Sequence, residues 1–584
     1  MNSETTSESA LNRKRSRKER ERCNTTRKLH KTSSAPSIAA GLPISSLPGH
    51  NKKDGLLLDV DHSITGNHGM SAEAVNMLTN KEAIDKMLLS DHICNELMKE
   101  VKRSGFVKLL RKRLTDLCKE LDLNPPIYTW ERWQARCKLF DLQQDALEAS
   151  LTPSSSSSAV QAKTLEEMLP ERKFVDPGLM EDLERGGFTP KSAQHIGTEL
   201  SLLSCQCAKE LREYTALLPT GAANVASLDK LHRVRVAVHK HSLDFSIGRF
   251  PKQILKLTRL HYDKLRALYS SFCGTHGRPD AAAAAAAASS DAVSSGSISK
   301  ATELLLAEMH TRMYILLSRY SSLLGHGFQM ALGEDCFRVL RKRIGTEFEC
   351  FASPLNCTNT RFTSAFPSAD VFFGSVGNFF SFSPLEGSFE ANPPFIPEVM
   401  AAMVMRIHSL LAAATGPMSF VVIVPGWLSD PAWVALTASI YKRAFYLVAA
   451  KDHGYCDGAQ HQRQDRFRES TYDTGVFILQ NRSGAAKWPT GGAAAKGGSD
   501  VEVEAEIRVA MARAIPTEMM RLRRLRDGRG HGDLDGGGGV YKGKKANAKT
   551  KDGDGGDTKD RGQGKKPNKS KSKEWKKKNE RKKK

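Results

Sequence analysis

The sequence predicts a doubly wound α/β sheet between about residues 301 and 490. The continuous apolar run Phe420–Val424 is typical of a strand that is covered on both faces. Val399, Met403 and Ile407 recur at helical spacing just after a proline that suits the first turn of a helix. Strand-like and helix-like segments alternate along this half of the chain, which is the element order of a doubly wound sheet.

The elements of this half are predicted in chain order. Two helices come first, at Leu304–Leu323 and Phe337–Ile344. A short buried strand at 348–352 then runs into a turn at 353–356, and a second strand ends just before Asn392. The later predicted elements are a helix that opens at Ile396–Glu398, the strand 420–424, a helix from Asp430 to about Arg443, strands at Ala444–Val448 and Gly475–Leu479, and a helix at 501–526.

The first half is predicted to be mainly helical, with one small hairpin. Amphipathic spacing predicts helices from about 80 to 123 and from 177 to 218. Strict alternation at 233–238, and again from Leu243 to Ile247, predicts two paired strands, followed by a basic helical stretch from 249 to 264. The eight alanines at 281–288 are interpreted as part of a low-complexity insertion without a functional site.

The net charge of +22 is concentrated at the two ends of the chain. Residues 1–60 hold 12 Lys or Arg against 6 Asp or Glu, and residues 541–584 hold 19 against 6, which leaves a net charge of +3 for the rest. By composition, both tails are predicted to be disordered. The basic segments 12–22 and 576–584 are typical of nuclear-import signals, which predicts a location in the nucleus. Two alternatives are that they are arms that bind RNA, or tails that only increase solubility.

These patterns divide the chain into six regions. They are a disordered basic region (1–75), a mainly helical accessory domain with a small β-hairpin (76–275), a low-complexity insertion (276–300), the α/β domain (301–490), a flexible segment and helix (491–526) and a disordered Lys-rich tail (527–584). No apolar run is long enough for a membrane span, and the eleven cysteines lack the paired spacing of a metal site. We therefore expect reduced thiols, no membrane partner and no metal.

The tetrapeptide Asn392-Pro393-Pro394-Phe395 lies between a predicted strand and a predicted helix. The side-chain oxygen of Asn392 and the carbonyl of Pro393 can accept the two N–H groups of a planar amino group such as that of adenine. The prolines fix φ and remove two backbone donors, so the loop offers its acceptors in a rigid shape, and Phe395 offers a flat face for a base. The tetrapeptide therefore indicates methylation of an exocyclic amino group; an ordinary proline turn is the structural alternative.

Four segments together resemble the cap-specific adenosine N6-methyltransferase family, which is also named for interaction with the phosphorylated polymerase tail. They are FECFASPLNC (348–357), SAFPSADVFFGS (364–375), SFEANPPF (388–395) and FILQN (477–481). The resemblance covers roughly residues 300–490 and extends more loosely back to about residue 80. It implies a Rossmann-like class I methyltransferase domain that transfers a methyl group from S-adenosyl-L-methionine to N6 of the 2′-O-methyladenosine next to the m7G cap of mRNA.

The resemblance extends to individual positions through these motifs. It implies that Asn392, Pro393, Pro394 and Phe395 form the catalytic loop. The positions implied to bind or border S-adenosyl-L-methionine are Phe351, Ser353, Pro354, Leu355, Asn356, Asp370, Glu390 and Asn392. Glu390 either holds a cofactor hydroxyl or shapes the loop. Capped mRNA is the implied partner.

One departure from the family concerns the aromatic group Tyr128, Trp130 and Trp133. Animal members of the family carry a WW module, in which two tryptophans are widely spaced with strands between them, and this segment lacks that spacing. The chain is therefore expected to have no recognisable WW module. Binding to the tail of RNA polymerase II is correspondingly a weaker expectation than binding to capped mRNA.

Six residues outside the catalytic loop are further candidates for RNA contact. They are Arg233, Arg235, Arg249 and Lys252 near the predicted hairpin, Trp427 after the strand 420–424, and His461 in the last loop of the α/β domain. Basic groups can contact phosphates, and an aromatic ring can stack on a cationic 7-methylguanine. Each has a structural alternative: surface charges for the basic residues, a packed core for Trp427 and a solvent-facing loop for His461.

Two other functions fit the same residues. The tetrapeptide also serves enzymes that methylate adenine in other RNA or in DNA, or a protein glutamine. The second alternative is a non-catalytic protein that binds RNA or the polymerase through a decayed site. The intact sequence from Asn392 to Phe395 argues against decay.

Overall fold

The computed structural model describes residues 93–139, 169, 175–218, 233–248, 250–289, 300–323, 329–490 and 500–518. All of these residues belong to one compact unit, Met1–Arg521. The tails predicted at 1–75 and 527–584 lie outside the described residues, as does the start of the helix predicted from residue 80. Within the described ranges, no helix has an apolar stretch that would span a bilayer, and no three His, Cys, Asp or Glu side chains gather as metal ligands would.

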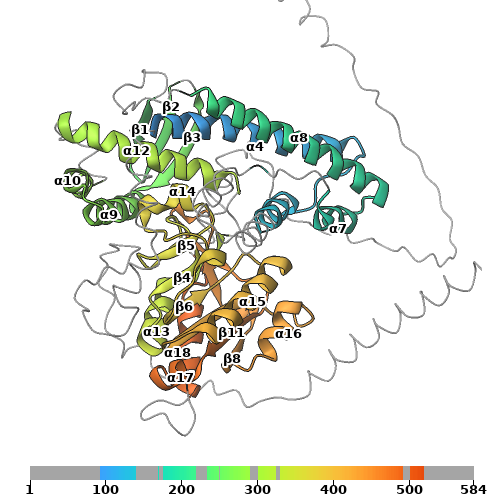
Figure 1. Cartoon of the computed structure of the whole chain (residues 1–584), viewed down its shortest axis with the longest axis vertical. Coiled ribbons are helices and arrows are strands. Elements are labelled where there is room, and N and C mark those ends of the chain that lie inside the picture. The colour runs from blue at the N-terminus through green and yellow to red at the C-terminus, as the bar shows by residue number, and fades with distance from the viewer. Residues whose placement is uncertain are drawn as a thin grey trace, which may run out of the picture. The chain divides into compact units, whose positions relative to one another are not determined.

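Long helices make up most of the first half of the described chain (Figure 1). They are α4 (Ile93–Lys119), a helix at 129–139, α7 (Pro177–Arg185), α8 (Pro190–Ala216), α9 (Arg259–Thr275), α10 (Pro279–Ala287) and α12 (Lys300–Ser321). The stretch 177–218, predicted to be helical, consists of two helices that are separated at Gly187, which has φ +97°. Asp176 caps α7 and Thr189 caps α8, and a proline follows each cap.

Buried apolar side chains join α4, α7, α8 and the helix 129–139 into one core. Trp130 and Trp133 lie in this core with their ring centroids 5.5 Å apart, and Trp130 donates a hydrogen bond from Nε1 to the carbonyl of Ser322 at 3.1 Å. Tyr128 is 37% exposed, but the rest of the aromatic group predicted from the sequence is packed inside the helical region. Its tryptophans position the helix 129–139.

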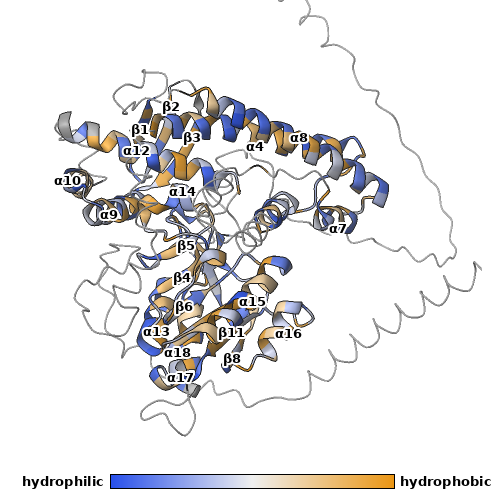
Figure 2. Ribbon diagram, in the orientation of Figure 1, coloured by the Kyte–Doolittle hydropathy of each residue, from blue (hydrophilic) through white to orange (hydrophobic). Residues whose placement is uncertain are grey.

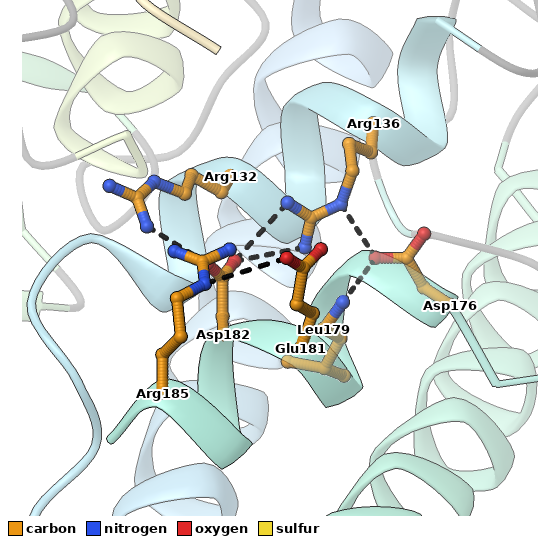
Figure 3. Close-up of polar contacts among 7 residues, drawn as sticks. All are labelled: Arg132, Arg136, Asp176, Leu179, Glu181, Asp182 and Arg185. Carbon is orange, nitrogen blue, oxygen red and sulfur yellow. Dashed lines mark hydrogen bonds and ion pairs between the residues drawn. The ribbon is translucent and has the colours of Figure 1, made fainter. Parts of the chain in front are cut away.

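Ion pairs also attach the helix 129–139 to α7 (Figure 3). Asp182 is buried and receives hydrogen bonds from Arg132 at 2.8 Å and from Arg136 at 3.1 Å. Arg136 also donates to Asp176 at 2.7 Å, and Arg185 forms an ion pair with Asp182 at 3.1 Å. The network neutralises two buried carboxylates and holds the two helices together.

Three antiparallel strands form a small sheet in the order β1-β2-β3. The strands β1 (Val234–Val238) and β2 (Ser242–Ile247) confirm the predicted hairpin. The helix predicted from residue 249 is wrong, because β3 (Phe250–Thr258) occupies this stretch and pairs with β2. Leu255 and Leu257 face the core while Lys256 between them is exposed, which is the period of a strand. Helix α9 starts only at Arg259.

Part of the predicted low-complexity insertion forms helix α10. Ala281, Ala284 and Ala285 are buried, and Arg266 of α9 donates hydrogen bonds to the carbonyls of Ala285 and Ala286 at 3.1 and 2.6 Å. Alanine has high helix propensity and a small side chain, so the helix can pack closely against its neighbours. The alanine run therefore contributes to the core of the helical region.

The second half of the described chain contains a six-stranded mixed sheet in the order β5-β4-β6-β7-β11-β8. Its strands are β4 (Phe348–Ala352), β5 (Phe362–Ser364), β6 (Gly387–Ala391), β7 (Met418–Pro425), β8 (Lys442–Val448) and β11 (Thr474–Gln480). The first four strands in this order pair in parallel, and β11 runs antiparallel to both β7 and β8. The predicted α/β class is confirmed as a mixed α/β arrangement.

Helices and short elements surround this sheet. They are α13 (Glu334–Ile344), α14 (Pro367–Asp370), α15 (Pro397–Ala413), α16 (Pro431–Thr437), α17 (Arg482–Lys487), α18 (Asp500–Ala512), the strand pair β9 (Gly454–Cys456) and β10 (Phe467–Glu469), and the 3-10 helices η4 (Val371–Phe373), η5 (Phe379–Ser381), η6 (Ala450–Asp452) and η7 (Gln460–Gln462). Helix α16 ends at Thr437, so the helix predicted to about Arg443 is too long. Lys442 and Arg443 belong instead to β8, which pairs with β11.

The central strand β7 is buried along its whole length, as its apolar run predicted. Phe420 and Val422 pack in one core with side chains of α15, and Val421 and Ile423 pack in another with side chains of α13 and α18. Figure 1 shows α15 on one side of the sheet and α13 and α18 on the other, and Figure 2 shows hydrophilic residues along α13, away from the sheet core. The two helical layers leave the strand ends as the place where polar side chains can reach a ligand.

Candidate active site

The two loops that the sequence singled out follow neighbouring strands. The strand β4 ends at Ala352 before the turn 353–356, and β6 ends at Ala391 before the loop 392–395. The two strands are parallel, with Glu349 opposite Glu390, so both loops lie at the same edge of the sheet. From β4 the sheet extends to β5 on one side, and from β6 it extends to β7 on the other. Ligands of open α/β sheets bind outside the carboxyl ends of the strands at such a switch point.

Asn392 is held in one orientation at the end of β6. Its side chain is 8% exposed, and Nδ2 donates a hydrogen bond to the carbonyl of Met330 at 3.3 Å. Among the described residues no donor is bonded to Oδ1 of Asn392, so this oxygen is available as an acceptor. Pro393 is buried, Pro394 and Phe395 are half-buried, and α15 begins two residues later with Pro397 at its start. The loop thus connects β6 directly to α15, with Asn392 and Pro393 buried at its start.

The turn after β4 is closed by its own side chains. Oδ1 of Asn356 accepts hydrogen bonds from the backbone N–H of Ser353 at 2.7 Å and from its hydroxyl at 2.9 Å. Pro354 and Leu355 are buried in this turn, and Nδ2 of Asn356 donates to the carbonyl of Gln329 at 3.0 Å. Ser353 and Asn356, which were predicted to bind the cofactor, therefore hold the turn in its shape through their own hydrogen bonds.

One backbone segment, the 329–331 strap (Gln329–Ala331), connects both loops. Its first carbonyl receives the bond from Asn356, and the carbonyl of Met330 receives the bond from Asn392. Ala331 then exchanges two backbone hydrogen bonds with Cys456 of β9, at 3.2 and 2.8 Å. The strap therefore sets the orientation of both asparagine amides. No local sequence pattern marked it as part of the site.

Glu349 and Glu390 are buried neighbours across β4 and β6. Oε1 of Glu349 accepts the backbone N–H groups of Thr358 and Asn359 at 2.8 and 2.6 Å, yet burial raises the pKa of this carboxyl to about 7. Burial, and next the charge of Glu349, raise the pKa of Glu390 well above its usual value. Two neighbouring carboxyl groups in a dry interior disfavour a second negative charge, so the charge of Glu349 adds to the effect of burial on the pKa of Glu390.

Asp370 lies beyond the neighbouring strand β5, in the short helix α14. It is fully buried, and its Oδ2 accepts a hydrogen bond from the hydroxyl of Tyr320 in α12 at 2.6 Å. Its Oδ1 has no hydrogen-bond partner among the described residues, and burial raises the pKa of the carboxyl to about 7. Phe351 is half-buried, and the centroid of its ring lies 4.7 Å from the ring centroid of Phe379. The predicted cofactor positions are thus spread over the ends of β4, β5 and β6.

The predicted RNA-contacting residues fall in two groups. Arg233 lies just before β1 and Arg235 lies on β1, and both are exposed on the small sheet of the helical region. Arg249 lies outside the described residues, and the side chain of Lys252 on β3 is also outside them. Arg233 and Arg235 thus belong to the small antiparallel sheet, whereas the loops that follow β4 and β6 belong to the six-stranded sheet.

His461 and Trp427 form the second group. His461 is 4% exposed in η7 and packs edge-on against His261 of α9, with ring centroids 6.3 Å apart. Burial lowers the pKa of His461 to about 4, so the solvent-facing alternative is wrong. Trp427 is half-buried beside Phe395, with ring centroids 6.5 Å apart, at the same sheet edge as the catalytic loop. The structure therefore brings Trp427 next to the loop 392–395.

Comparison with known proteins identifies two similar curated proteins, each called mRNA (2′-O-methyladenosine-N(6)-)-methyltransferase. The mouse protein and the human protein are each 41% identical to this chain over 187 residues. The match covers 30% of this chain, and 26% of the mouse protein and 27% of the human protein. The similarity therefore spans about a quarter of the length of these relatives.

A family model corrects one prediction from the sequence. The model described as the phosphorylated CTD interacting factor 1 WW domain matches residues 292–458. The expectation that the chain has no recognisable WW module is therefore contradicted. That expectation depended on tryptophan spacing near Trp130 and Trp133, whereas the matched residues begin before α12 and run past β9.

Proposed function

We propose that this protein is an S-adenosyl-L-methionine-dependent mRNA cap adenosine N6-methyltransferase. Its substrate is the 2′-O-methyladenosine next to the m7G cap, and its α/β half is a Rossmann-like class I methyltransferase domain preceded by a mainly helical accessory domain. The observation that carries the proposal is the position of Asn392–Phe395 at the switch point of the sheet, with Nδ2 of Asn392 already engaged by Met330. The two similar curated methyltransferases support the same conclusion.

The loop provides two acceptors for the amino group of adenine. Oδ1 of Asn392 accepts one N–H, because Nδ2 of the same amide points to the strap. The carbonyl of Pro393 accepts the other. These bonds draw the nitrogen lone pair away from the purine ring and hold the nitrogen in line for attack. Phe395 stacks on the base and stops it from rotating.

The residues at the ends of β4, β5 and β6 fit a bound S-adenosyl-L-methionine. Oδ1 of Asp370 is a buried acceptor without a hydrogen bond in the described part of the chain, and hydroxyl groups are suitable donors for it. Phe351 and the turn 353–356 border the methionine and adenosine parts, and Glu390 lies two residues before Asn392. The cofactor supplies an electrophilic methyl group on a sulfonium, and these residues orient it toward the amino group.

The remaining expectations belong to this proposal as well. The basic segments 12–22 and 576–584 support a nuclear location. The description of the matching family model keeps a phosphorylated polymerase tail among the proposed partners. Capped mRNA is the principal proposed partner.

The test is mass spectrometry of a short transcript after incubation with the purified protein and S-adenosyl-L-methionine. A capped RNA that begins with 2′-O-methyladenosine should gain one methyl mass at its first nucleotide. Matched substrates are the same RNA without the cap, an RNA with only internal adenosines, and single-stranded DNA. Methylation of all four at equal rates would favour a general adenine methyltransferase, and methylation of none would favour a non-catalytic binding protein.

A further inference from the structure

Three buried polar side chains meet where the strand β11 begins. Thr474 is the first residue of β11 and lies opposite Pro425 of β7 and Val448 of β8 in the six-stranded sheet. Its hydroxyl oxygen lies 2.9 Å from Nε2 of His453 and 2.8 Å from the hydroxyl oxygen of Tyr455, and all three side chains are buried. Tyr455 belongs to β9 of the two-stranded sheet, so this Thr474 network (Thr474, Tyr455 and His453) joins two sheets.

The direction of each hydrogen bond in the Thr474 network follows from its partners. Nδ1 of His453 lies 2.8 Å from the carbonyl oxygen of Ala449, and since a carbonyl only accepts, Nδ1 carries the hydrogen. Burial lowers the pKa of His453, so the ring is neutral at neutral pH and Nε2 is an acceptor. Thr474 therefore donates to Nε2, and the hydroxyl of Tyr455 donates to Thr474. Loss of the Thr474 hydroxyl would leave a buried donor and a buried acceptor without this partner.

The strand β9 connects the Thr474 network to the 329–331 strap. Cys456 follows Tyr455 in β9, and it exchanges the two backbone hydrogen bonds with Ala331, at 3.2 and 2.8 Å. Met330 precedes Ala331, and its carbonyl accepts the hydrogen bond from Nδ2 of Asn392 at 3.3 Å. A continuous series of hydrogen bonds and adjacent residues thus leads from the hydroxyl of Thr474 to the amide of Asn392.

Close packing of Gly454 also restricts the position of β9. A Cβ at this glycine would lie 2.2 Å from the carbonyl oxygen of Ala514 and 2.6 Å from that of Arg468. Both neighbouring atoms belong to the backbone, so they cannot move aside as the end of a flexible side chain could. The strand that holds the strap is therefore fixed by backbone contacts at Gly454 and by the Thr474 network on the residues around it.

We propose that Thr474, Tyr455 and His453 are positioning residues for methyl transfer, which act on Asn392 through β9 and the strap. This inference rests on the proposed function, because it concerns the amide that accepts the amino group of adenine. A shift of the strap changes the direction of the Asn392 amide, and a small misplacement of a positioned group can lower a rate about 100-fold.

The test compares Thr474→Val with Thr474→Ser in the full-length protein. Valine keeps the branched shape of threonine without the hydroxyl, whereas serine keeps the hydroxyl. Thr474→Val should lower kcat for capped RNA by about 10- to 100-fold, and Thr474→Ser should stay close to the wild type. The KM for RNA should be unchanged in both variants, because the network orients the amide and leaves the RNA-binding surface intact. Steady-state kinetics separate the two quantities.

Thr346 provides a matched control for the loss of a buried hydroxyl. Its hydroxyl is hydrogen-bonded to that of Ser388 at 3.1 Å, near the starts of β4 and β6 and so at the opposite ends of these strands from the two loops. Thr346→Val should lower the melting temperature as Thr474→Val does, but it should keep the kcat of the wild type. Equal kcat values for Thr474→Val and Thr346→Val would contradict the positioning role.

A double variant tests whether the effect passes through Asn392. In the Asn392→Ala background, Thr474→Val should change kcat by less than about twofold, because the amide that the network orients is absent. An equal loss of kcat in both backgrounds would show that the route through the strap is wrong.

Hydrogen exchange at the amides of Ala331 and Cys456 gives a measurement that needs no activity. Exchange should be faster in Thr474→Val than in Thr474→Ser or Thr346→Val. Tyr455→Phe removes one donor and keeps the bond from Thr474 to His453, so it should show a smaller increase, and it serves as the test if Thr474→Val does not fold.

The two proposals fail in different ways. If exchange and kcat of Thr474→Val and Tyr455→Phe match the wild type, the positioning role is wrong even though the wild type methylates capped RNA. If exchange increases as expected but the wild type methylates no adenosine, the proposed function fails and the hold of the Thr474 network on the strap stands.

Discussion

The side-chain amide of Asn392 donates a hydrogen bond to the backbone carbonyl of Met330 at 3.3 Å. This contact fixes the orientation of the Asn392 amide. Because Nδ2 donates to Met330, Oδ1 lies on the other side of the amide, where it can accept a hydrogen bond from the amino group of the target adenine. Met330 belongs to the 329–331 strap, whose preceding carbonyl is bonded to Asn356 in the turn after β4. The two loops of the candidate site are thus oriented by one shared segment.

Replacement of Asn392 tests the acceptor role directly. We expect Asn392→Ala to lower kcat for capped RNA by about 100- to 1,000-fold, the usual effect of removing one positioned hydrogen-bonding group. RNA binding should be retained, since the aromatic rings and basic tails are unchanged. Rapid-quench methylation assays and RNA-binding titrations measure the two quantities.

Asn481 provides a matched control for this variant. Its Oδ1 caps α17 by accepting from Gly484 N–H at 2.7 Å and also accepts from Met418 N–H at 3.0 Å. Asn481→Ala should therefore lower the melting temperature while the folded enzyme keeps its kcat. Full activity of Asn392→Ala would contradict the acceptor role.

The hydrogen bond from Asn356 to Gln329 of the 329–331 strap predicts that Asn356 positions the strap. Asn356→Asp keeps an oxygen for the bonds from Ser353 but replaces the donor to Gln329 with a carboxylate oxygen. Loss of this bond should destabilise the protein by about 1–3 kcal/mol, since an unsatisfied buried acceptor remains. Because Met330 is the next residue, kcat should also fall.

Ser353→Ala is the comparison for Asn356→Asp. It removes one hydroxyl donor to Asn356 but leaves the backbone bond and the contact with the strap. Denaturant unfolding and steady-state kinetics should show a smaller change in both stability and kcat. A kcat for Asn356→Asp equal to that of Ser353→Ala would contradict the role of the strap.

The buried pair Glu349 and Glu390 predicts that stability depends on pH. The pKa of Glu349 is raised from 4.5 to about 7, and that of Glu390 is raised well above its usual value. The folded state therefore holds protons that the unfolded chain releases. The stabilising contribution is fully present below about pH 4.5 and is lost as the pH rises through 7 and above. Urea unfolding of Glu390→Gln at pH 5 and pH 8 should show its largest gain over the wild type at pH 8.

Glu308 is a carboxyl with the opposite behaviour. It forms an ion pair with Arg278 at 2.6 Å, and although burial is the largest influence on its pKa, this pairing holds the pKa below the usual value. Its contribution is present above its unfolded pKa and is lost as the pH falls through the folded value. Glu308→Gln should therefore lose stability at pH 8. A pH-independent effect of Glu390→Gln would contradict the raised pKa of Glu390.

The ion-pair network of Figure 3 predicts that Asp182 is needed to hold the helix 129–139. Its side chain is fully buried and pairs with Arg132, Arg136 and Arg185. Asp182→Asn should cost about 1–3 kcal/mol of unfolding free energy, because it removes the charged acceptor that Arg132 and Arg136 share, although Arg136 keeps its ion pair with Asp176. Hydrogen exchange should increase in the helix 129–139.

Glu181, which precedes Asp182 on α7, provides the control. It is 70% exposed and lies 3.7 Å from Arg185, so its ion pair is a surface pair. Glu181→Gln should change stability by less than about 1 kcal/mol. Equal effects of the two substitutions would mean that the network does not hold the helix.

Local patterns predicted the sheet well where both faces of a strand are buried. Strands that are covered on both faces carry continuous apolar runs, which a sequence shows directly. The three predicted strands of this kind fall within β4 (348–352), β7 (420–424) and β11 (475–479). The strand β3 was mistaken for a helix, since the basic residues at 249–264 fit either period until pairing with β2 decides. The buried position of His461 also depends on a residue far away in the chain, His261 of α9.

The sequence by itself determined the chemistry of the loop 392–395, since two prolines, an amide and a ring specify a rigid pair of acceptors wherever the loop is placed. Only the tertiary structure decided what surrounds it. The strap at 329–331 and the burial of Glu349 beside Glu390 both depend on contacts between residues far apart in the chain. Periodicity and motif spacing report local geometry, and such long-range contacts are set by the packing of the whole unit.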